Sequence, residues 1–397
     1  MEQQPDILQD SPDFSLVLGG PFFQLFRRAH LSGTGLELLH RRIAVITAVA
    51  WVPLAIFSFA SGSAFGSAGS LPFFKDIETQ ARFLVALPIL IAAELIVHLR
   101  LRQVVQNFVK REIIRPEELS RFNSAIHSAM RLRNSVILEV SLLLLVCTVG
   151  YWIWRNQIAL GTASWYASYA NGRAELTVAG YWNAFVSVPI FQFILLRWYV
   201  RLLIWFRFLW QVSRLKLQLI ATHPDRAGGI SFLGRSSYAF GPILFAQGAM
   251  LSGLIASRVL YNGQKLLSFK MDAIGFIAFF VLFILGPLVM FSPQLAQAKR
   301  KGLGDYGVLA QRYVRDFEKT WIKQEGTGHS ELLGSADIQS LADLGNSYDI
   351  IREMKSVPFG IQDISRLAIV TAAPLVPLGL VIFSFEELVT RLLKVIF

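Results

Sequence analysis

The sequence predicts an all-α fold: a polytopic helical membrane protein with about seven transmembrane helices and cytoplasmic helical extensions. Hydrophobic residues make up 54% of the 397-residue chain and charged residues only 16%, against about 25% in an ordinary soluble domain. The hydrophobic residues form continuous runs of about 20 residues, the length that crosses a bilayer as a helix. Lys and Arg gather in alternate segments between these runs, which is typical of a multi-pass protein.

The apolar runs are the expected spans. In lipid every backbone polar group must be bonded within its own segment or within a closed barrel, and continuous runs exclude the alternating strands of a barrel. The runs cover residues 43–60, 82–99, 135–154, 182–204, 238–258, 273–292 and 367–385.

The last run contains Pro374 and Pro377, each of which removes a helix hydrogen bond. It therefore crosses with a kink, leaving the amphipathic tail 386–397 outside, or it re-enters and leaves that tail at the cytoplasmic interface. Its length favours a crossing.

Positive charge predicts the orientation. Of the 38 Lys and Arg residues, 27 fall in the segments 1–42, 99–133, 205–236 and 293–366, and only five fall in the intervening segments. We therefore expect a multi-pass protein of the inner (plasma) membrane with a cytoplasmic N-terminus. This topology and anionic lipid account for the net charge of +11, so nucleic acid is not an expected partner.

The expected organisation has four parts. A cytoplasmic N-terminal segment, 1–42, precedes a six-helix membrane domain, 43–292, whose loops 99–133 and 205–236 are cytoplasmic. A cytoplasmic helical region, 293–360, then leads to a C-terminal membrane segment and tail, 361–397. Residues 99–133 read as a helical hairpin broken near Pro116.

Two amphipathic helices are expected within 293–360. The first has an apolar face spaced by three and four residues between Gly304 and Ile322, and the second has one from Ile338 to Ile351. They must bury these faces against each other, against the 99–133 hairpin or against a neighbouring subunit.

The stretch ATHPDRAGG, 221–229, marks a turn or a site. The fourth span is expected to continue as a cytoplasmic helix until Pro224 ends it, and two glycines then allow a sharp return to the membrane. A structural turn accounts for all these residues, whereas a gate or a ligand-binding loop would use the exposed charges. The candidate residues are His223, Asp225, Arg226, Gly228 and Gly229.

Charged residues also occur inside the predicted spans. Glu94 and Glu139 are expected roughly 7–9 Å below the cytoplasmic surface, and Arg197 about 6 Å below it, with Arg201 one turn further on. The four residues thus share one level. They form either a structural ion-pair network joining three spans or the lining of an ion or proton pathway, since charged groups within a bilayer mark such pathways.

Small residues recur at a spacing of four along the fifth span. Gly248, Ser252 and Ala256 form one line and Gly253 lies in a second, parallel line. Small side chains at this spacing let helices approach closely. The stripe is an intrachain contact, a subunit interface or the wall of a pore, and intrachain packing is the simplest of these.

Motifs for cofactors and metals are missing from the sequence. It contains no H-E-x-x-H and no Walker-type loop, and GLGDYG at 302–307 lacks the preceding strand that a dinucleotide site requires. We expect no catalytic residue, no metal and no cofactor.

The leading interpretation is a channel or transporter for a small ion or solute, embedded in lipid as a homo-oligomer. One alternative is a membrane-anchored sensor or scaffold that acts through its cytoplasmic helices. Another is a membrane-embedded enzyme acting on lipid through His223 and Asp225.

Overall fold

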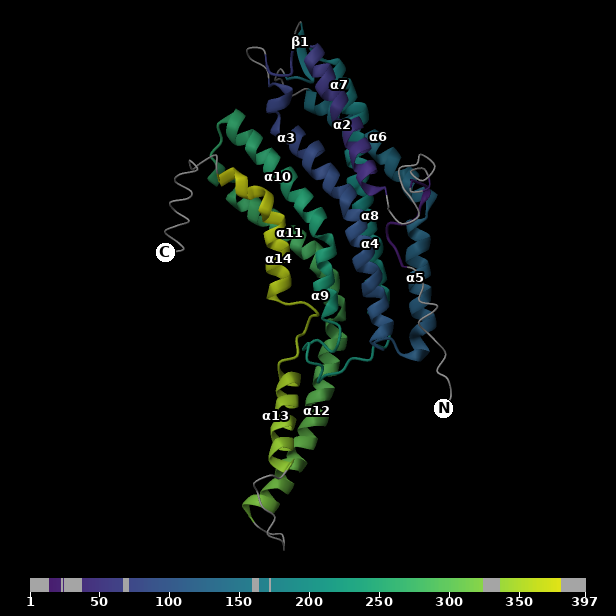
Figure 1. Ribbon diagram of the computed structural model, residues 1–397, viewed down its shortest axis with the longest axis vertical. Helices are drawn as coiled ribbons and strands as arrows, with labels where there is room; N and C mark the ends of the chain where they lie inside the picture. Colours follow the sequence, from purple (N-terminus) through teal and green to yellow (C-terminus); the bar gives the residue numbers. More distant parts are fainter. Residues whose placement is uncertain are drawn as a thin grey trace.

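Long helices make up almost all of the computed structural model (Figure 1). The structure describes residues 14–22, 24, 38–66, 71–158, 164–170, 173–323 and 336–379. The predicted amphipathic tail 386–397 and most of the N-terminal segment lie outside the described residues. The all-α fold class is confirmed, with one small antiparallel hairpin of β1 (Ala167–Ala170) and β2 (Arg173–Leu176) as its only named strands in the described part.

Six helical segments are long and apolar enough to cross a membrane. They are Leu39–Ala60, Ile77–Lys110, Val178–Val212, Phe232–Asn262, Leu266–Ile322 and Ile361–Leu378. The remaining predicted run, 135–154, falls in α6 (Val136–Ile158), whose Val136–Thr148 part is apolar but shorter. All seven apolar runs of the sequence thus coincide with helix over the residues that the structure describes.

The helices form two neighbouring groups (Figure 1). One group contains α2 (Leu39–Ala60), α4 (Leu87–Lys110), α6 and α8 (Val188–Val212), and the other contains α10 (Gly241–Asn262), α11 (Lys270–Leu285) and α14 (Ile361–Ala372). Helix α10 joins the groups, because it packs on α4 and on α14. The β1–β2 hairpin lies at one end of the molecule, called here the strand end.

A helical hairpin projects from the opposite end, called here the hairpin end (Figure 1). It consists of α12 (Ser292–Phe317) and α13 (Ala336–Arg352), which pack side by side. The Tyr313 hydroxyl donates to the Asp337 carbonyl at 3.0 Å, and the Trp321 indole donates to the Asp337 carboxylate at 3.1 Å. The two predicted amphipathic helices therefore lie against each other.

A second, shorter helical hairpin lies beside the bundle. Helix α4 runs on to Lys110, a 3-10 turn begins at Pro116, and α5 (Leu119–Arg133) returns along the bundle. Phe122 of α5 packs on Phe108 of α4 and on Phe208 of α8, with ring centroids 5.8 and 6.0 Å apart. The predicted break near Pro116 is present.

The fourth span ends earlier than the sequence predicts. Helix α8 stops at Val212, well before Pro224, so the expectation that it continues to His223 is wrong. The reason is tertiary: other elements bond the backbone of the following segment. The side-chain amide of Gln294 donates to the carbonyls of Ser213 and Leu215 at 2.6 and 2.9 Å. The backbone amide of Gln218 donates to the Ile113 carbonyl at 2.8 Å.

The start of the described chain packs onto the bundle. Phe14, Leu16 and Val17 are buried, and the Phe14 ring lies 5.2 Å from that of Phe208. The Ser15 carbonyl accepts a hydrogen bond from Arg133 at 2.5 Å. The sequence predicted only a polar cytoplasmic segment here, because this apolar stretch is too short to stand out.

Candidate functional site

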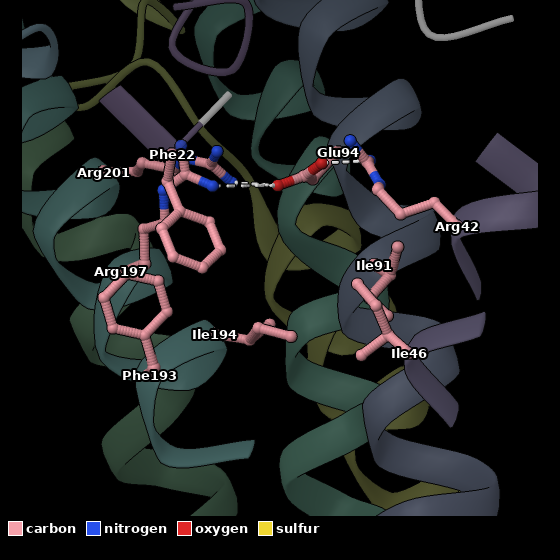
Figure 2. Close-up of a pocket in the computed structure, with 9 residues that line it drawn as sticks. All are labelled: Phe22, Arg42, Ile46, Ile91, Glu94, Phe193, Ile194, Arg197 and Arg201. Carbon is pink, nitrogen blue, oxygen red and sulfur yellow. Dashed lines mark hydrogen bonds and ion pairs between the residues drawn. The ribbon is translucent and has the colours of Figure 1, made fainter. Parts of the chain in front are cut away.

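A buried cluster of charged residues lies where α2, α4, α6 and α8 meet. At its centre is Glu94 of α4, whose carboxylate lies between the guanidinium groups of Arg42 and Arg201 (Figure 2). Arg201 Nη1 is 2.9 Å from Glu94 Oε1, Arg197 Nη1 is 3.8 Å from the same oxygen, and Arg42 pairs with Oε2. One carboxylate thus contacts three arginines.

Glu139 extends the cluster to α6. Its Oε1 lies 3.2 Å from Nη2 of Arg197, and its Oε2 accepts a hydrogen bond of 2.7 Å from the backbone amide of Phe22. Arg197 therefore bridges the two carboxylates. The structure brings together all four residues that the sequence placed at one level, Glu94, Glu139, Arg197 and Arg201.

Aromatic side chains hold the arginines in place. The Arg201 guanidinium lies 4.8 Å from the Trp198 ring centroid, and the Trp198 indole donates to the Leu90 carbonyl of α4 at 2.8 Å. The Arg197 guanidinium lies 5.7 Å from the ring of Phe22. Such contacts favour a cation over a ring face, and they fix α8 against α4.

The cluster carries more positive than negative charge. Among the described residues, three arginines face two glutamates, and none of the five side chains is more than 11% exposed. A fourth arginine, Arg133 at the end of α5, lies nearby and bonds to neutral oxygens of Ser15 and Asn134. Burial, together with the charge of Arg201, lowers the pKa of Arg133 to about 10. The described side chains of the site thus carry more positive than negative charge in a poorly solvated place, which favours anions.

A small cavity adjoins the cluster. It has a volume of about 10 Å³, close to the space that one water molecule needs. Arg42, Glu94, Arg197 and Arg201 form its charged side, and apolar side chains that include Ile46, Ile91, Phe193 and Ile194 form the remainder (Figure 2).

The sequence did not indicate two parts of this site, Arg42 and the backbone amide of Phe22. Arg42 was assigned to the N-terminal segment, but it lies in the first turn of α2 and is 1% exposed. An arginine that directly precedes an apolar run is normally read as an interfacial charge. The Phe22 amide carries no side-chain signal at all.

The HPDRAGG turn is built around Asp225. Its Oδ1 accepts hydrogen bonds from the amides of Ala227 and Gly229 at 2.8 and 3.0 Å, and its Oδ2 accepts one from Ser231 at 3.0 Å. Burial raises the pKa of Asp225, but these backbone hydrogen bonds outweigh burial and hold its pKa below the ordinary value. The carboxylate thus organises the turn.

The turn also binds the segment after α13. The Arg226 guanidinium lies 2.8 Å from Glu353, and the Arg226 carbonyl accepts a hydrogen bond of 2.7 Å from the amide of Lys355. Gly228 has a φ of +63°, and a Cβ there would lie 3.0 Å from Leu219 Cβ and 3.3 Å from Met354 Cε. A side chain at position 228 would therefore be strained.

The small residues of α10 lie at contacts within the chain. A Cβ on Gly248 would lie 2.1 Å from the Thr371 carbonyl oxygen of α14, and one on Gly253 would lie 2.9 Å from the Ala81 Cβ. Ala256 is buried and Ser252 is partly buried. These residues let α10 approach two neighbours at once.

Within the described residues, no group of three or more His, Cys, Asp or Glu side chains is arranged to hold a metal ion. No family model, no curated protein and no solved structure matches this chain. Functional inference therefore depends on the charged cluster, the turn and the projecting hairpin themselves.

Proposed function

We propose that this chain is an integral membrane protein that passes a small inorganic anion across the bilayer, as a channel or transporter assembled from identical subunits. The observation that carries this proposal is the excess positive charge of the cluster formed by Arg42, Glu94, Glu139, Arg197 and Arg201. Buried arginines lower the barrier for an anion and raise it for a cation.

The proposed topology follows from the charge pattern. The hairpin end, which carries most of the Lys and Arg residues, faces the cytoplasm of the inner membrane, and the strand end faces outward. The six long apolar helices and α6 cross the bilayer, with the Pro374–Pro377 region as a kink in the last span. The N-terminus is then cytoplasmic, and the charged cluster lies in the inner half of the bilayer.

In this proposal Glu94 competes with the transported anion. Its carboxylate holds the donors of Arg42 and Arg201, which are the same donors that an entering anion needs. An anion therefore reaches the arginines only by displacing Glu94. Neutralising Glu94 should therefore raise anion flux. Neutralising Arg197, which contacts both carboxylates, should lower it, because the cluster loses a positive charge that attracts the anion.

Flux from liposomes tests the proposal. Purified protein is reconstituted, and efflux of chloride, nitrate and K⁺ is measured for wild type, Glu94→Gln, Glu139→Gln and Arg197→Gln. The matched controls are Glu117→Gln and Arg115→Gln, which change the same charges at exposed positions. Anion flux that rises in Glu94→Gln and falls in Arg197→Gln supports the proposal.

Two outcomes would overturn it. Folded wild type and variants could all fail to release either anion, or K⁺ could pass as readily as chloride in every protein. The charged cluster would then be a structural network that ties α2, α4, α6 and α8 together.

The second candidate function is a membrane-anchored sensor or scaffold, and the projecting hairpin favours it. Helices α12 and α13 extend well beyond the bundle (Figure 1), and Leu309 and Val314 of α12 are 50% and 39% exposed. Exposed apolar side chains on a projecting element suit contact with a partner or another copy. Under this second proposal, the particle mass measured by light scattering in detergent is lower for Leu309→Asp than for wild type. Neither protein then releases ions from liposomes.

A further inference from the structure

A cleft lies beside the HPDRAGG turn, apart from the charged cluster. Its volume is about 250 Å³, far more than one water molecule needs. Ile113 and Ile220 give it apolar walls, and three polar side chains line it: Arg111, Gln218 and His223. An apolar cleft with a few convergent polar groups is the usual form of a small-molecule site.

Three chain segments build this cleft. The connection after α4 contributes Arg111 and Ile113, and the extended segment after α8 is tied to it through the bond from the Gln218 amide to the Ile113 carbonyl. The Ile220 amide donates to the Gly228 carbonyl at 3.3 Å, which closes the turn. The cleft is therefore formed by backbone contacts between elements distant in sequence.

Gly229 keeps the side of the cleft next to His223 open. Its φ is +95°, and a Cβ there would lie 3.8 Å from Cδ2 of the His223 ring. Another residue type would be strained at this φ and would place its side chain against the imidazole. The His223 ring thus borders open space.

His223 is oriented by Asp225. Its Nδ1 lies 2.9 Å from Asp225 Oδ1 and 3.2 Å from the backbone amide of Asp225. The contact with the carboxylate is the shorter of the two and the charged one, and it requires a proton on Nδ1, so we assign the hydrogen to Nδ1. In the neutral ring Nε2 then has a free lone pair, and in the charged ring it donates a proton. The ring therefore presents to the cleft a nitrogen that accepts or donates.

Arg111 supplies the positive charge. Its guanidinium lies 5.1 Å from the ring centroid of Phe232, and its side chain is exposed. Among the described residues it forms no ion pair, unlike Arg226 in the adjacent turn, which contacts Glu353. A guanidinium in this state is available to a planar or tetrahedral oxyanion.

We propose that this cleft binds a phosphate monoester or inorganic phosphate, with Arg111 pairing to the anionic oxygens and His223 Nε2 exchanging a hydrogen bond with a phosphate hydroxyl. A carboxylate or a sulfate has no proton to offer Nε2 near neutral pH. Inorganic phosphate carries a hydroxyl there in both of its ionisation states, and a phosphate monoester carries one until its second ionisation near 6. The side-chain amide of Gln218 can donate or accept a hydrogen bond beside the phosphate. This site does not depend on the anion-passage function proposed for the charged cluster.

Calorimetric titration of the full-length protein with inorganic phosphate tests the proposal. The protein is held in phosphatidylcholine nanodiscs near pH 6.5 at fixed ionic strength, and sodium sulfate is titrated in parallel. We expect phosphate to bind more tightly than sulfate. Arg111→Gln should weaken phosphate binding about tenfold or more, because a charge-assisted hydrogen bond is lost, and the exposed Arg115→Gln is the matched control with unchanged affinity.

A second variant isolates the role of the imidazole. His223→Asn keeps a side-chain donor near the position of Nδ1, so the contact with Asp225 is preserved, but it removes Nε2. We expect it to abolish the preference for phosphate over sulfate while weak anion binding to Arg111 persists. Gln218→Ala, at an exposed side chain, provides a further readout should Arg111→Gln fail to fold.

The source of the phosphate is distinguished by adding phosphatidic acid to the nanodiscs. Weakened binding of inorganic phosphate would assign the site to a lipid monoester, and unchanged binding would assign it to a soluble one. The proposal is overturned by folded wild type that binds no phosphate, by equal binding of sulfate, or by unchanged affinity in Arg111→Gln.

Discussion

Replacing Glu94 by Gln tests how far the charged cluster holds the bundle together. The substitution preserves shape but removes the charge shared by Arg42, Arg201 and Arg197, so that within the described residues Glu139 alone is left to pair with this cluster, through Arg197. Removing one partner of a buried ion pair typically costs about 3–5 kcal/mol, because the remaining charge stays desolvated. A single pair at about 4 Å contributes on the order of 4 kcal/mol at an effective dielectric constant of 20, which agrees with that range.

We therefore expect Glu94→Gln to lower the free energy of unfolding by about 3–5 kcal/mol, measured by titration with sodium dodecyl sulfate in mixed micelles. The double variant Glu94→Gln/Arg201→Gln restores the net charge that the cluster has in the wild type. It should be more stable than the sum of its single variants predicts, by about 0.5–3 kcal/mol.

The pair of Arg82 and Glu78 is the matched control, because their side chains are 20% and 35% exposed and lie 2.5 Å apart. Glu78→Gln should lower the free energy of unfolding by less than about 1 kcal/mol. The argument that burial makes this cluster strongly stabilising would be refuted if Glu94→Gln lowered the free energy of unfolding by less than about 1 kcal/mol. It would also be refuted if the effects of the two single variants were additive.

Two further substitutions test the turn and the packing of α10. Asp225→Asn should lower the free energy of unfolding by about 1–3 kcal/mol at neutral pH, because three backbone amides lose a charged acceptor. The exposed Asp305→Asn should cost nothing measurable. Since the folded-state pKa of Asp225 lies below its ordinary value of 3.8, its contribution is present above that pH and is lost as the pH falls below it. Unfolding curves of both variants between neutral and acidic pH check this, and an unchanged difference at all pH values would contradict it. Gly248→Ala should destabilise by about 1–3 kcal/mol or more, because its Cβ would lie 2.1 Å from the Thr371 carbonyl oxygen. Gly275→Ala meets no atom within 4 Å and should be stabilising by about 0.5–1 kcal/mol, so equal effects of these two substitutions would count against the packing argument.

The membrane helices could be predicted because one physical rule dominates them. A run of about 20 apolar residues in lipid has no alternative to helix, and each such run of this sequence coincides with one in the described residues. Pro116 likewise indicated its break, since proline disfavours helix at the preceding residue. Outside the apolar runs the prediction was weaker. The segment after Val212 alternates apolar and polar residues, with Leu215, Leu217 and Leu219 two positions apart, a period that does not favour helix, and Gln294 and Ile113 bond its backbone.

The charged cluster was only partly predictable for a related reason. Depth along a helix follows from counting residues, so Glu94, Glu139, Arg197 and Arg201 could be assigned to one level. Which side of each helix faces its neighbours does not follow from depth, and so the sequence did not indicate Arg42. The cleft near His223 was beyond prediction, because its Arg111 and Gln218 come from segments that meet only in the folded chain.

The N-terminal segment connects these observations to the proposed function. The Phe22 amide bonds to Glu139, the Phe22 ring lies near the Arg197 guanidinium, and Ser15 contacts both His98 and Arg133. Residues 14–22 therefore cover the cluster next to its fourth arginine. Phe22 also lines the small cavity beside Glu94. Under the proposed function, an anion that reaches Arg197 from the cytoplasm must pass this segment, so the segment and Glu94 together would set access to the site.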